Sequence, residues 1–170
     1  MHKYIYNYIN SRMNRPSNNQ FSLIDNTIGD TISCMKWGPN SSLLAASSWD
    51  NKVRVWDVKE GYGGNLAAQP MAATDMGEPV LQISWNREGT AIFAGCADNF
   101  VKMWDLQQNR VVNLGQHTQP VAQVHWCEAM NVLYSMSWDK TISIWDGKQA
   151  APIVSTTLDR KVCAFTLNRS

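Results

Sequence analysis

The 170-residue sequence carries little charge and has no long apolar run. Charged residues make up 17% of the chain and the net charge is +1, so it lacks the basic excess that drives non-specific binding to nucleic acids. No apolar run approaches the roughly 18 residues that a membrane-spanning helix needs, and we expect no membrane insertion. The apolar residues among the first ten positions are interrupted by Asn and do not predict a secretory signal.

Clusters of metal ligands are also missing from the sequence. The four cysteines lie far apart, which excludes a zinc site of paired cysteines and favours a reducing compartment. His2 and His125 have no partner at metal-ligand spacing. The glycine-rich stretch 61–65 lacks the Lys-Ser or Lys-Thr ending of a phosphate-binding loop. We therefore expect neither a metal ion nor a cofactor.

What the sequence does contain is a repeat that ends in Trp-Asp. Its three copies are VRVWDV at 53–58, VKMWDL at 101–106 and ISIWDG at 142–147. The Trp residues are 48 and then 41 residues apart, and a second Trp lies nineteen residues before each of them. Similarity at about 40–45 residues with this ending is typical of β-propeller blades, which bury their apolar faces only against neighbouring blades.

Each unit predicts four short strands, because apolar residues alternate over short runs that turn residues separate. The second strands are expected at 43–48, 91–96 and 132–137, and the fourth strands at about 68–72, 110–114 and 152–156. The predicted fold is therefore all-β: an incomplete propeller with three four-stranded blades and the first strand of a fourth. We expect residues 1–20 to form a flexible tail and 21–170 the partial propeller. Its predicted parts are blade 1 at about 32–73, blade 2 at 80–114, blade 3 at 121–156 and the start of blade 4 at 162–166.

Polar residues at fixed places in the repeat predict a structural hydrogen-bond network. An Asp in the turn before each third strand can accept backbone N–H groups, and in repeats of this kind it orients a loop His that reaches the strand Trp through a Ser. Only the third unit has all of these residue types, so we expect it to be the most rigid. The candidates are Asp50, Asp98, Asp139, His117, Ser135 or Ser137, and Trp56, Trp104 and Trp145.

A Ser, a His and an Asp could also form a hydrolytic triad. The repeat supplies a structural role for each of these residues, however, and the Asp and Trp recur in units that lack the His. We therefore predict no enzymatic activity.

Two further tryptophans, Trp49 and Trp138, precede the turn Asp in the first and third units, where the second unit has Ala97. Each unit already has two tryptophans for its core, so these two are expected at one rim of the propeller. Trp is enriched among binding hot spots, and Lys52 and Lys140 flank the same turns. The four residues are the candidate partner-binding site; the alternative is that each Trp packs on a neighbouring blade.

The sequence resembles WD-repeat proteins in the stretches DTISCMKW, SSWDNKVRVWDV, EPVLQISWNREGTAIFAGCADNFVKMWDL, QPVAQVHW and SMSWDKTISIWD. More narrowly, it resembles the nuclear-pore-associated mRNA export factors of the Rae or Gle type. The spindle-checkpoint propellers of the Bub type are a close second. In both groups the first repeat lacks the loop His and Ser-Trp-Asp occurs in repeats one and three, as it does here.

The resemblance implies a seven-bladed propeller that binds a Glu-rich GLEBS motif on one face, beside Trp49 and Trp138. The motif would come from a nucleoporin in mRNA export, with mRNA ribonucleoprotein contacted indirectly, and from kinases in the checkpoint alternative. The implied locations are the nucleus, the nuclear pore and the cytoplasm. A direct RNA-binding propeller is a third possibility, which the near-neutral charge disfavours.

Three blades leave two sheets open to solvent, and open sheets invite pairing with other chains. We therefore expect the missing blades to come from a longer chain or from a partner, and the isolated species to be poorly soluble or to form oligomers.

Overall fold

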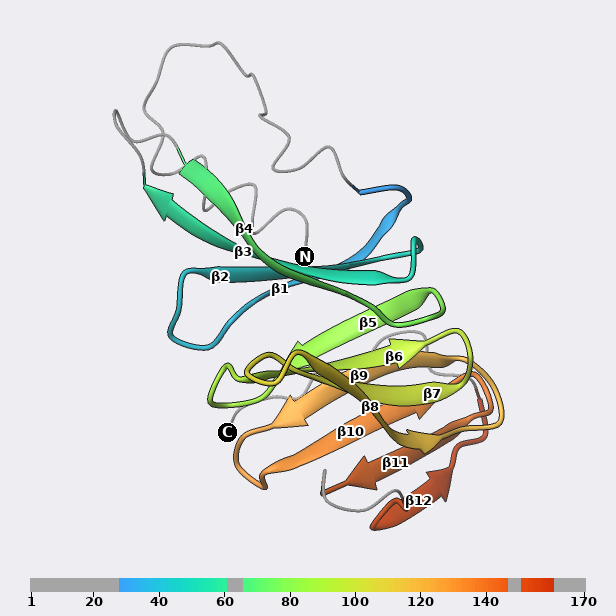
Figure 1. The fold of residues 1–170 in the computed structure, drawn as a ribbon. Coiled ribbons are helices and arrows are strands. Elements are labelled where there is room, and N and C mark those ends of the chain that lie inside the picture. Colours follow the sequence, from blue (N-terminus) through green and yellow to red (C-terminus); the bar gives the residue numbers. More distant parts are fainter. Residues whose placement is uncertain (1–27, 61–65, 147–150, 161–170) are drawn as a thin grey trace, which may run out of the picture.

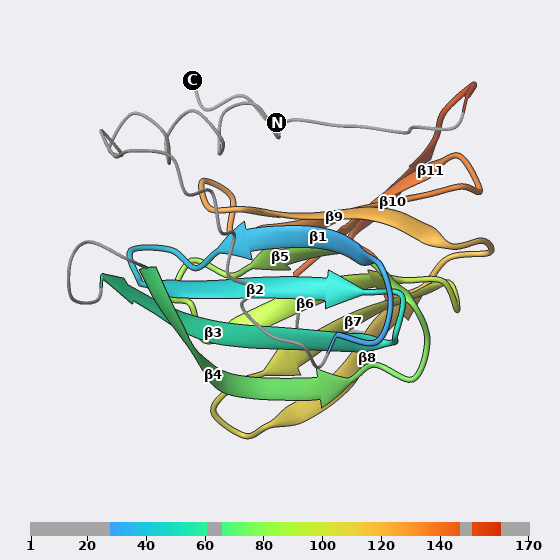
Figure 2. The same cartoon turned by 90° about the horizontal axis from the view of Figure 1, so that it is seen from above.

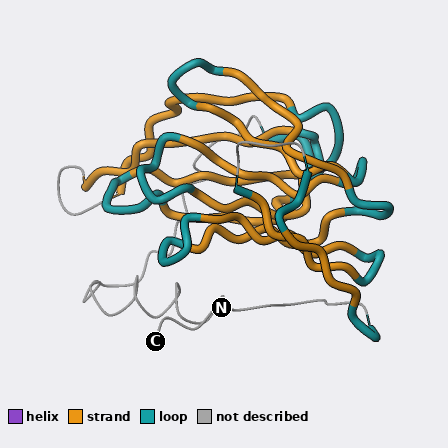
Figure 3. Tube along the Cα trace, turned by 90° about the horizontal axis from the view of Figure 1, so that it is seen from below, coloured by secondary structure: helices purple, strands orange, loops and turns teal. Residues whose placement is uncertain are grey.

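The computed structural model describes residues 28–60, 66–146 and 151–160. Within these ranges every regular element is a β-strand (Figure 3). The strands form three sheets of four, and the sheets lie one on another (Figure 1). The predicted all-β class with three four-stranded units is confirmed. The predicted tail at 1–20 and the strand at 162–166 lie outside the described residues.

All three sheets are antiparallel meanders in chain order. The first sheet contains β1 (Ile32–Trp37), β2 (Leu43–Ser48), β3 (Lys52–Glu60) and β4 (Leu66–Asp75). The second contains β5 (Val80–Trp85), β6 (Ala91–Cys96), β7 (Phe100–Asp105) and β8 (Arg110–Gln116). The third contains β9 (Val121–Cys127), β10 (Val132–Ser137), β11 (Thr141–Trp145) and β12 (Val154–Thr157).

The strands differ from the predicted ranges mainly at the fourth position of each unit. β4 is longer than the predicted 68–72, and it pairs with β3 along the whole length of that strand. The pairing shifts register between Val55 and Trp56, where Met71 is the extra residue opposite them. Such a bulge accommodates Pro70, which has no N–H to give to the ladder. Here inter-strand pairing, which local composition does not reveal, decides where the strand ends.

The first strand of each sheet brings the sheets together. β5 packs against β1, and β9 packs against β5 and β6 (Figure 2). Apolar side chains from facing sheets form two clusters. The first cluster joins Ala45, Val53 and Val55 of the first sheet to Ile83, Trp85 and Trp104 of the second. The second cluster joins Phe93, Val101 and Leu114 of the second sheet to Val124, Leu133 and Trp145 of the third.

Each sheet therefore has two different faces. We call the face that packs on the preceding sheet the leading face, and the opposite one the trailing face. On leading faces the first-strand Trp is the main contact. Trp85 Nε1 donates to Lys36 O at 3.1 Å. The ring of Trp126 stacks on Phe93 with the centroids 5.2 Å apart. Aromatic burial and stacking of this kind stabilise the contact beyond its area alone.

Gly115 on β8 makes room for the third-strand Trp of the next sheet. A Cβ atom at Gly115 would lie 2.0 Å from the ring carbon Cζ3 of Trp145. Trp145 is almost fully buried and cannot move aside without disturbing the second cluster. The glycine is thus required by the close approach of two sheets.

We expect Gly115→Ala to lower the free energy of unfolding by about 1–3 kcal/mol, because the added methyl overpacks the contact with Trp145. Urea unfolding measured by circular dichroism tests this. Gly29→Ala is the matched control, because a Cβ there meets Asp50 only at ordinary distances of 3.6–3.7 Å. The control should change the free energy of unfolding by no more than about 0.5 kcal/mol. Equal effects of the two changes would contradict the close packing of the second and third sheets.

Candidate functional site

The turns between second and third strands lie at one rim of the stacked sheets and share one construction. In each sheet the residue before the turn Asp donates its backbone N–H to the loop before the first strand, at 2.9–3.0 Å. These bonds join Trp49 N to Thr31 O, Ala97 N to Pro79 O, and Trp138 N to Pro120 O. Because the backbone is held in the same way each time, the three side chains occupy equivalent places on the rim.

The Asp of each turn caps the turn itself. One carboxylate oxygen accepts the N–H two residues later: Lys52 N to Asp50 at 3.1 Å, Phe100 N to Asp98 at 3.2 Å and Thr141 N to Asp139 at 2.8 Å. The residue between them has positive φ: 68° at Asn51, 73° at Asn99 and 72° at Lys140. Asn tolerates this left-handed conformation better than most residues. Asn51 and Asn99 are therefore well suited to their turns, whereas the third turn uses Lys140.

The third sheet brings four predicted network residues together. Trp145 Nε1 donates to Ser135 Oγ at 2.7 Å, and Ser135 Oγ lies 2.7 Å from His117 Nε2. On its other side, His117 Nδ1 lies 2.8 Å from Thr141 Oγ1 and 3.3 Å from Asp139 Oδ2. Asp139 Oδ2 also accepts the N–H of Thr118 at 2.9 Å. The buried polar groups of Trp145, Ser135 and His117 are thus paired with one another.

These contacts assign the proton of the ring. The Thr141 hydroxyl donates its hydrogen to Asp139. The Ser135 hydroxyl oxygen accepts the Trp145 N–H, so the Ser135 hydrogen is left to donate to His117. We infer that Nδ1 of His117 carries hydrogen toward Asp139 and Thr141, while Nε2 accepts from Ser135. Burial lowers the pKa of His117, although the nearby Asp139 opposes this effect. The ring is therefore neutral near pH 7.

The state of Asp139 follows from the same contacts. Burial alone would raise the pKa of Asp139, but the hydrogen bonds from Thr141 and Thr118, together with the His117 ring, outweigh it. The pKa of Asp139 is held below its usual range, so the carboxylate is ionised at neutral pH.

A basic side chain replaces the His in the first two sheets. Both Arg54 and Lys102 lie four residues after the turn Asp and are buried. Arg54 binds Asp50 through two N–H groups, at 3.1 and 2.7 Å, and Lys102 Nζ lies 2.5 Å from Asp98 Oδ2. Lys102 Nζ also donates to Met76 O at 2.6 Å, and Met76 is the repeat equivalent of His117. A cation thus takes the place of the imidazole.

Sequence reasoning missed this exchange, although a signal was present. Arg54 and Lys102 interrupt apolar strands at the same place in the repeat, where the third unit has Ser143. A charge at such a position is buried only if it is paired. The preceding Asp four residues away is the partner that the spacing offers.

On the rim, Trp49 and Trp138 project into solvent, with 45% and 39% of their surfaces exposed. Lys52 and Lys140 are exposed beside them. The equivalent rim position between the two rings carries the small side chain of Ala97. The structure therefore presents two indoles at equivalent turns, separated by a blade with no bulky group there.

Two family models for WD40 sequences match this chain. The WD domain, G-beta repeat covers residues 21–57, and the WD40 domain of anaphase-promoting complex subunit 4 covers residues 66–129. Together they span more than half of the chain, and both are models of WD40 repeats. The chain is a WD40-repeat protein.

Among WD40 proteins, the chain is similar to mRNA export factors. It is 36% identical over 139 residues to the Poly(A)+ RNA export protein of Schizosaccharomyces pombe, which is 80% of this chain and 38% of that protein. It is 34% identical over 140 residues to mRNA export factor rae-1 of Caenorhabditis elegans, 79% of this chain and 36% of that one. The chain thus spans about two fifths of the length of these relatives.

The Ser that links the Trp to the loop His is present in the third blade alone. Ala46 and Ala94 stand where the third blade has Ser135. Trp104 Nε1 therefore donates to Asn109 Oδ1 at 3.1 Å. Trp56 Nε1 is buried and has no hydrogen-bond partner among the described residues. Trp56 and Trp104 therefore take no part in a Ser-linked chain of bonds among the described residues, because the acceptor side chain is absent.

The two serines offered for the third blade have different roles. Ser135 links Trp145 to His117, whereas Ser137 donates to Gln119 O at 2.8 Å and accepts the Asp139 N–H at 3.1 Å. Ser48 makes the equivalent pair of bonds in the first blade. Ser137 therefore shapes the turn and is not part of the chain of bonds to the Trp.

The Ser135–His117–Asp139 arrangement resembles a triad in its bonding but not in its access. Ser135 is fully buried, and the Trp145 N–H points at its hydroxyl oxygen. A nucleophile needs a position where a substrate carbon can reach it, and none exists at this atom. The geometry supports a structural role for the three residues.

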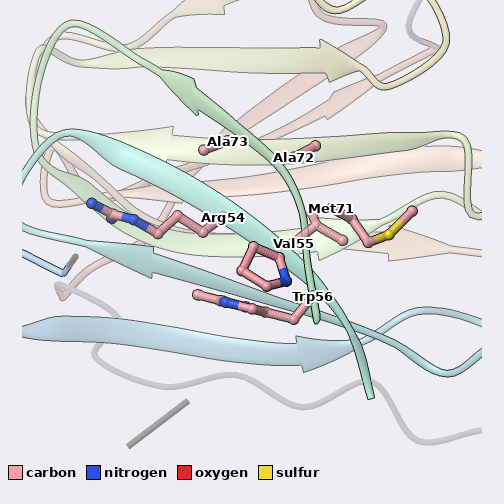
Figure 4. A pocket seen from close by; sticks show the side chains of 7 residues that line it. Arg54, Val55, Trp56, Met71, Ala72 and Ala73 are labelled. Atoms are coloured by element: carbon pink, nitrogen blue, oxygen red, sulfur yellow. The ribbon is translucent and has the colours of Figure 1, made fainter. Parts of the chain in front are cut away.

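A hollow of about 350 Å³ on the first blade is lined by Arg54, Val55, Trp56, Pro70, Met71, Ala72 and Ala73 (Figure 4). No three His, Cys, Asp or Glu side chains gather as metal ligands in the part of the chain that the structure describes. None of these described residues forms a helix long and apolar enough to cross a membrane.

We expect Ala46→Ser to raise the free energy of unfolding by about 1 kcal/mol, because it gives the buried Trp56 N–H an acceptor at the place of Ser135. Ala94→Ser is the matched control, since Trp104 already has Asn109 as its acceptor. Thermal or urea unfolding of the two variants measures the difference. A gain for Ala94→Ser that equals the gain for Ala46→Ser would show that the unpaired indole is not the cause.

The neutral His117 makes stability depend on pH. Its pKa is lower in the folded state than in the unfolded chain, so the unfolded state binds the proton first as the pH falls. The stabilisation from His117 is complete above about pH 6.5 and declines below it, by at most about 1.4 kcal/mol per pH unit. Urea unfolding at pH 7.5, 6.0 and 5.0 should show this decline.

His117→Gln is the comparison variant for this series. The difference in the free energy of unfolding between the wild type and His117→Gln should shrink as the pH falls from 7.5 to 5.0. The carboxylate of Asp139 stays ionised throughout this range. A difference that grows on acidification would mean that the folded protein holds His117 protonated against Asp139.

Proposed function

We propose that this chain belongs to a non-enzymatic adaptor in mRNA export linked to the nuclear pore. In this proposal the propeller rim binds a GLEBS-type motif of a nucleoporin, and contact with mRNA ribonucleoprotein is indirect. The adaptor would act in the nucleus, at the pore and in the cytoplasm. Similarity to mRNA export factors over about four fifths of the chain supports the role.

The observation that carries the proposal is the pair of exposed indoles at equivalent turns. Trp49 and Trp138 are held by the same backbone hydrogen bond, each beside a turn that its Asp fixes. An indole on a fixed turn loses little conformational freedom when it binds a partner. Rigid, half-exposed Trp residues are the usual anchors of protein interfaces.

Charge plays the smaller part at this rim. Lys52 and Lys140 are exposed and attract an acidic peptide, but Asp30 and Glu78 are exposed in loops of the same rim and oppose it. Solvent-screened pairs contribute about 0–1 kcal/mol each. The rings should therefore carry most of the affinity, and the lysines mainly the rate of association.

Binding of a GLEBS-type peptide to this chain, followed by calorimetry, tests the proposal. Trp49→Ala and Trp138→Ala should each weaken binding by about 2 kcal/mol or more, because each removes an anchor. Lys52→Ala should cost no more than about 1 kcal/mol.

Met130→Ala is the control for this experiment, because Met130 is 63% exposed in the β9–β10 turn at the opposite rim. It should leave the affinity unchanged. If both Trp variants bound the peptide with unchanged affinity, the proposed binding site at Trp49 and Trp138 would be wrong. A loss in the control equal to that in the Trp variants would place the peptide elsewhere.

A further inference from the structure

The second blade carries only small side chains at the place on the rim where its neighbours carry indoles. The turns after β2, β6 and β10 lie on the same side of the stack, with the turn after β6 between the other two (Figure 1). Ala97 takes the place of Trp49 and Trp138 in this middle turn, and its backbone N–H is held in the same way. The rim therefore has an exposed ring on each side of a methyl group.

The loop beside Ala97 is open as well. A Cβ atom at Gly77 would meet no heavy atom of the described residues within 4 Å. The glycine is nevertheless fixed, because its N–H donates to Asp75 Oδ1 at 2.7 Å and its carbonyl accepts from Asn51 Nδ2 at 3.3 Å. We call the stretch of rim formed by Gly77 and Ala97 the crossing.

Phe100, at the start of β7, is a large side chain of the middle turn but is half-buried. Its ring lies 5.9 Å from Nζ of Lys102, a buried group that is paired with Asp98. Contact with a buried group directs this ring toward its own blade. The crossing thus stays free of the kind of exposed ring that Trp49 and Trp138 present on either side.

The distance between the two indoles suits a short extended peptide. Facing sheets lie about 10 Å apart, so the first and third sheets, with one sheet between them, are about 20 Å apart. An extended chain advances about 3.3 Å per residue, so about six residues cover this distance. One segment of a partner can therefore contact both rings if no bulky side chain stands between them.

Charge differs between the crossing and the two ends of this path. Glu78 follows Gly77 in the same loop and is exposed, and so is Asp75. The exposed Lys52 and Lys140 lie at the turns of the indoles instead. Acidic residues of a partner are thus favoured at the two ends of the path and disfavoured in its middle.

We propose that the crossing selects the partner, an inference that rests on the adaptor function proposed above. One extended segment contacts Trp49 and Trp138 with residues about six positions apart, and it passes over Gly77 and Ala97 with small or neutral side chains. Ala97 is then a specificity-determining residue, because a long side chain at this place obstructs the path between the two anchors.

Calorimetry with a GLEBS-type peptide tests this role of Ala97. Ala97→Arg and Ala97→Glu place long side chains of opposite charge at the crossing. Both should weaken binding at least about tenfold, because each separates the peptide from one of its anchors. The turn itself accepts large side chains, since Trp49 and Trp138 occupy the equivalent places, and circular dichroism checks that the sheets are retained.

Two variants serve as matched controls. Ala97→Ser keeps a small side chain at the crossing and should bind like the wild type. Met130→Arg places a long cationic side chain on the opposite rim, where Met130 is 63% exposed, and should also bind like the wild type.

Coupling between the two anchors gives a second measurement. When one segment holds both rings, Trp49→Ala and Trp138→Ala each weaken binding. In the Ala97→Arg background the peptide reaches only one ring, so one of the two Trp changes should lose its effect on affinity.

The outcomes separate this inference from the adaptor function. Unchanged affinity of Ala97→Arg and Ala97→Glu, with binding still weakened by Trp49→Ala and Trp138→Ala, overturns the crossing and leaves the adaptor function standing. Opposite effects of Arg and Glu also overturn it, because they show that charge and not size acts there. Trp effects that persist in full in the Ala97→Arg background mean that the rings are reached by separate routes. A wild-type chain that does not bind the peptide overturns both proposals.

Discussion

The structure depends on one constraint: a sheet with two apolar faces is stable only when neighbouring sheets cover both of them. The second and third blades meet this constraint by placing a first-strand and a third-strand Trp against the blade before them. The glycine at position 115 and the small residues of the second strands let the sheets approach closely enough for these rings to be buried. Stability is therefore shared among blades, and none of them forms a closed core of its own.

The polar contacts follow from that packing, because the Asp-bearing turns are held between adjacent loops and strands. The turn Asp is paired with a different group in each blade: a guanidinium in the first, an ammonium in the second and a neutral imidazole in the third. The turn geometry is the same in all three cases. Each repeat thus keeps the turn Asp paired, and this pairing fixes the rim. The rim is the surface at which we propose that the partner binds.

The repeat predicted the strands well, because short runs of apolar and small residues recur between turn residues in every unit; β2, β6 and β10 begin and end at the predicted residues. The end of β4 depends on its pairing with β3 and could not be predicted from composition. In the site, the exposure of Trp49 and Trp138 agrees with their excess over the core pattern. The exchange of His for Arg54 and Lys102 was not predicted, because these cations come from the third strand and not from the loop that holds the His.

The central claim is that the blades stabilise one another through their tryptophans. Native-state hydrogen exchange of the Trp85→Ala variant in dilute solution tests it most directly, read at the amides of β2 and β3. Those strands belong to the first blade, in which no residue is changed. Truncating a buried Trp costs about 3–5 kcal/mol, and the account predicts that much of this loss appears as lower protection in β2 and β3. Unchanged protection there, with losses confined to the second blade, would show that each sheet is stable alone and would contradict the account.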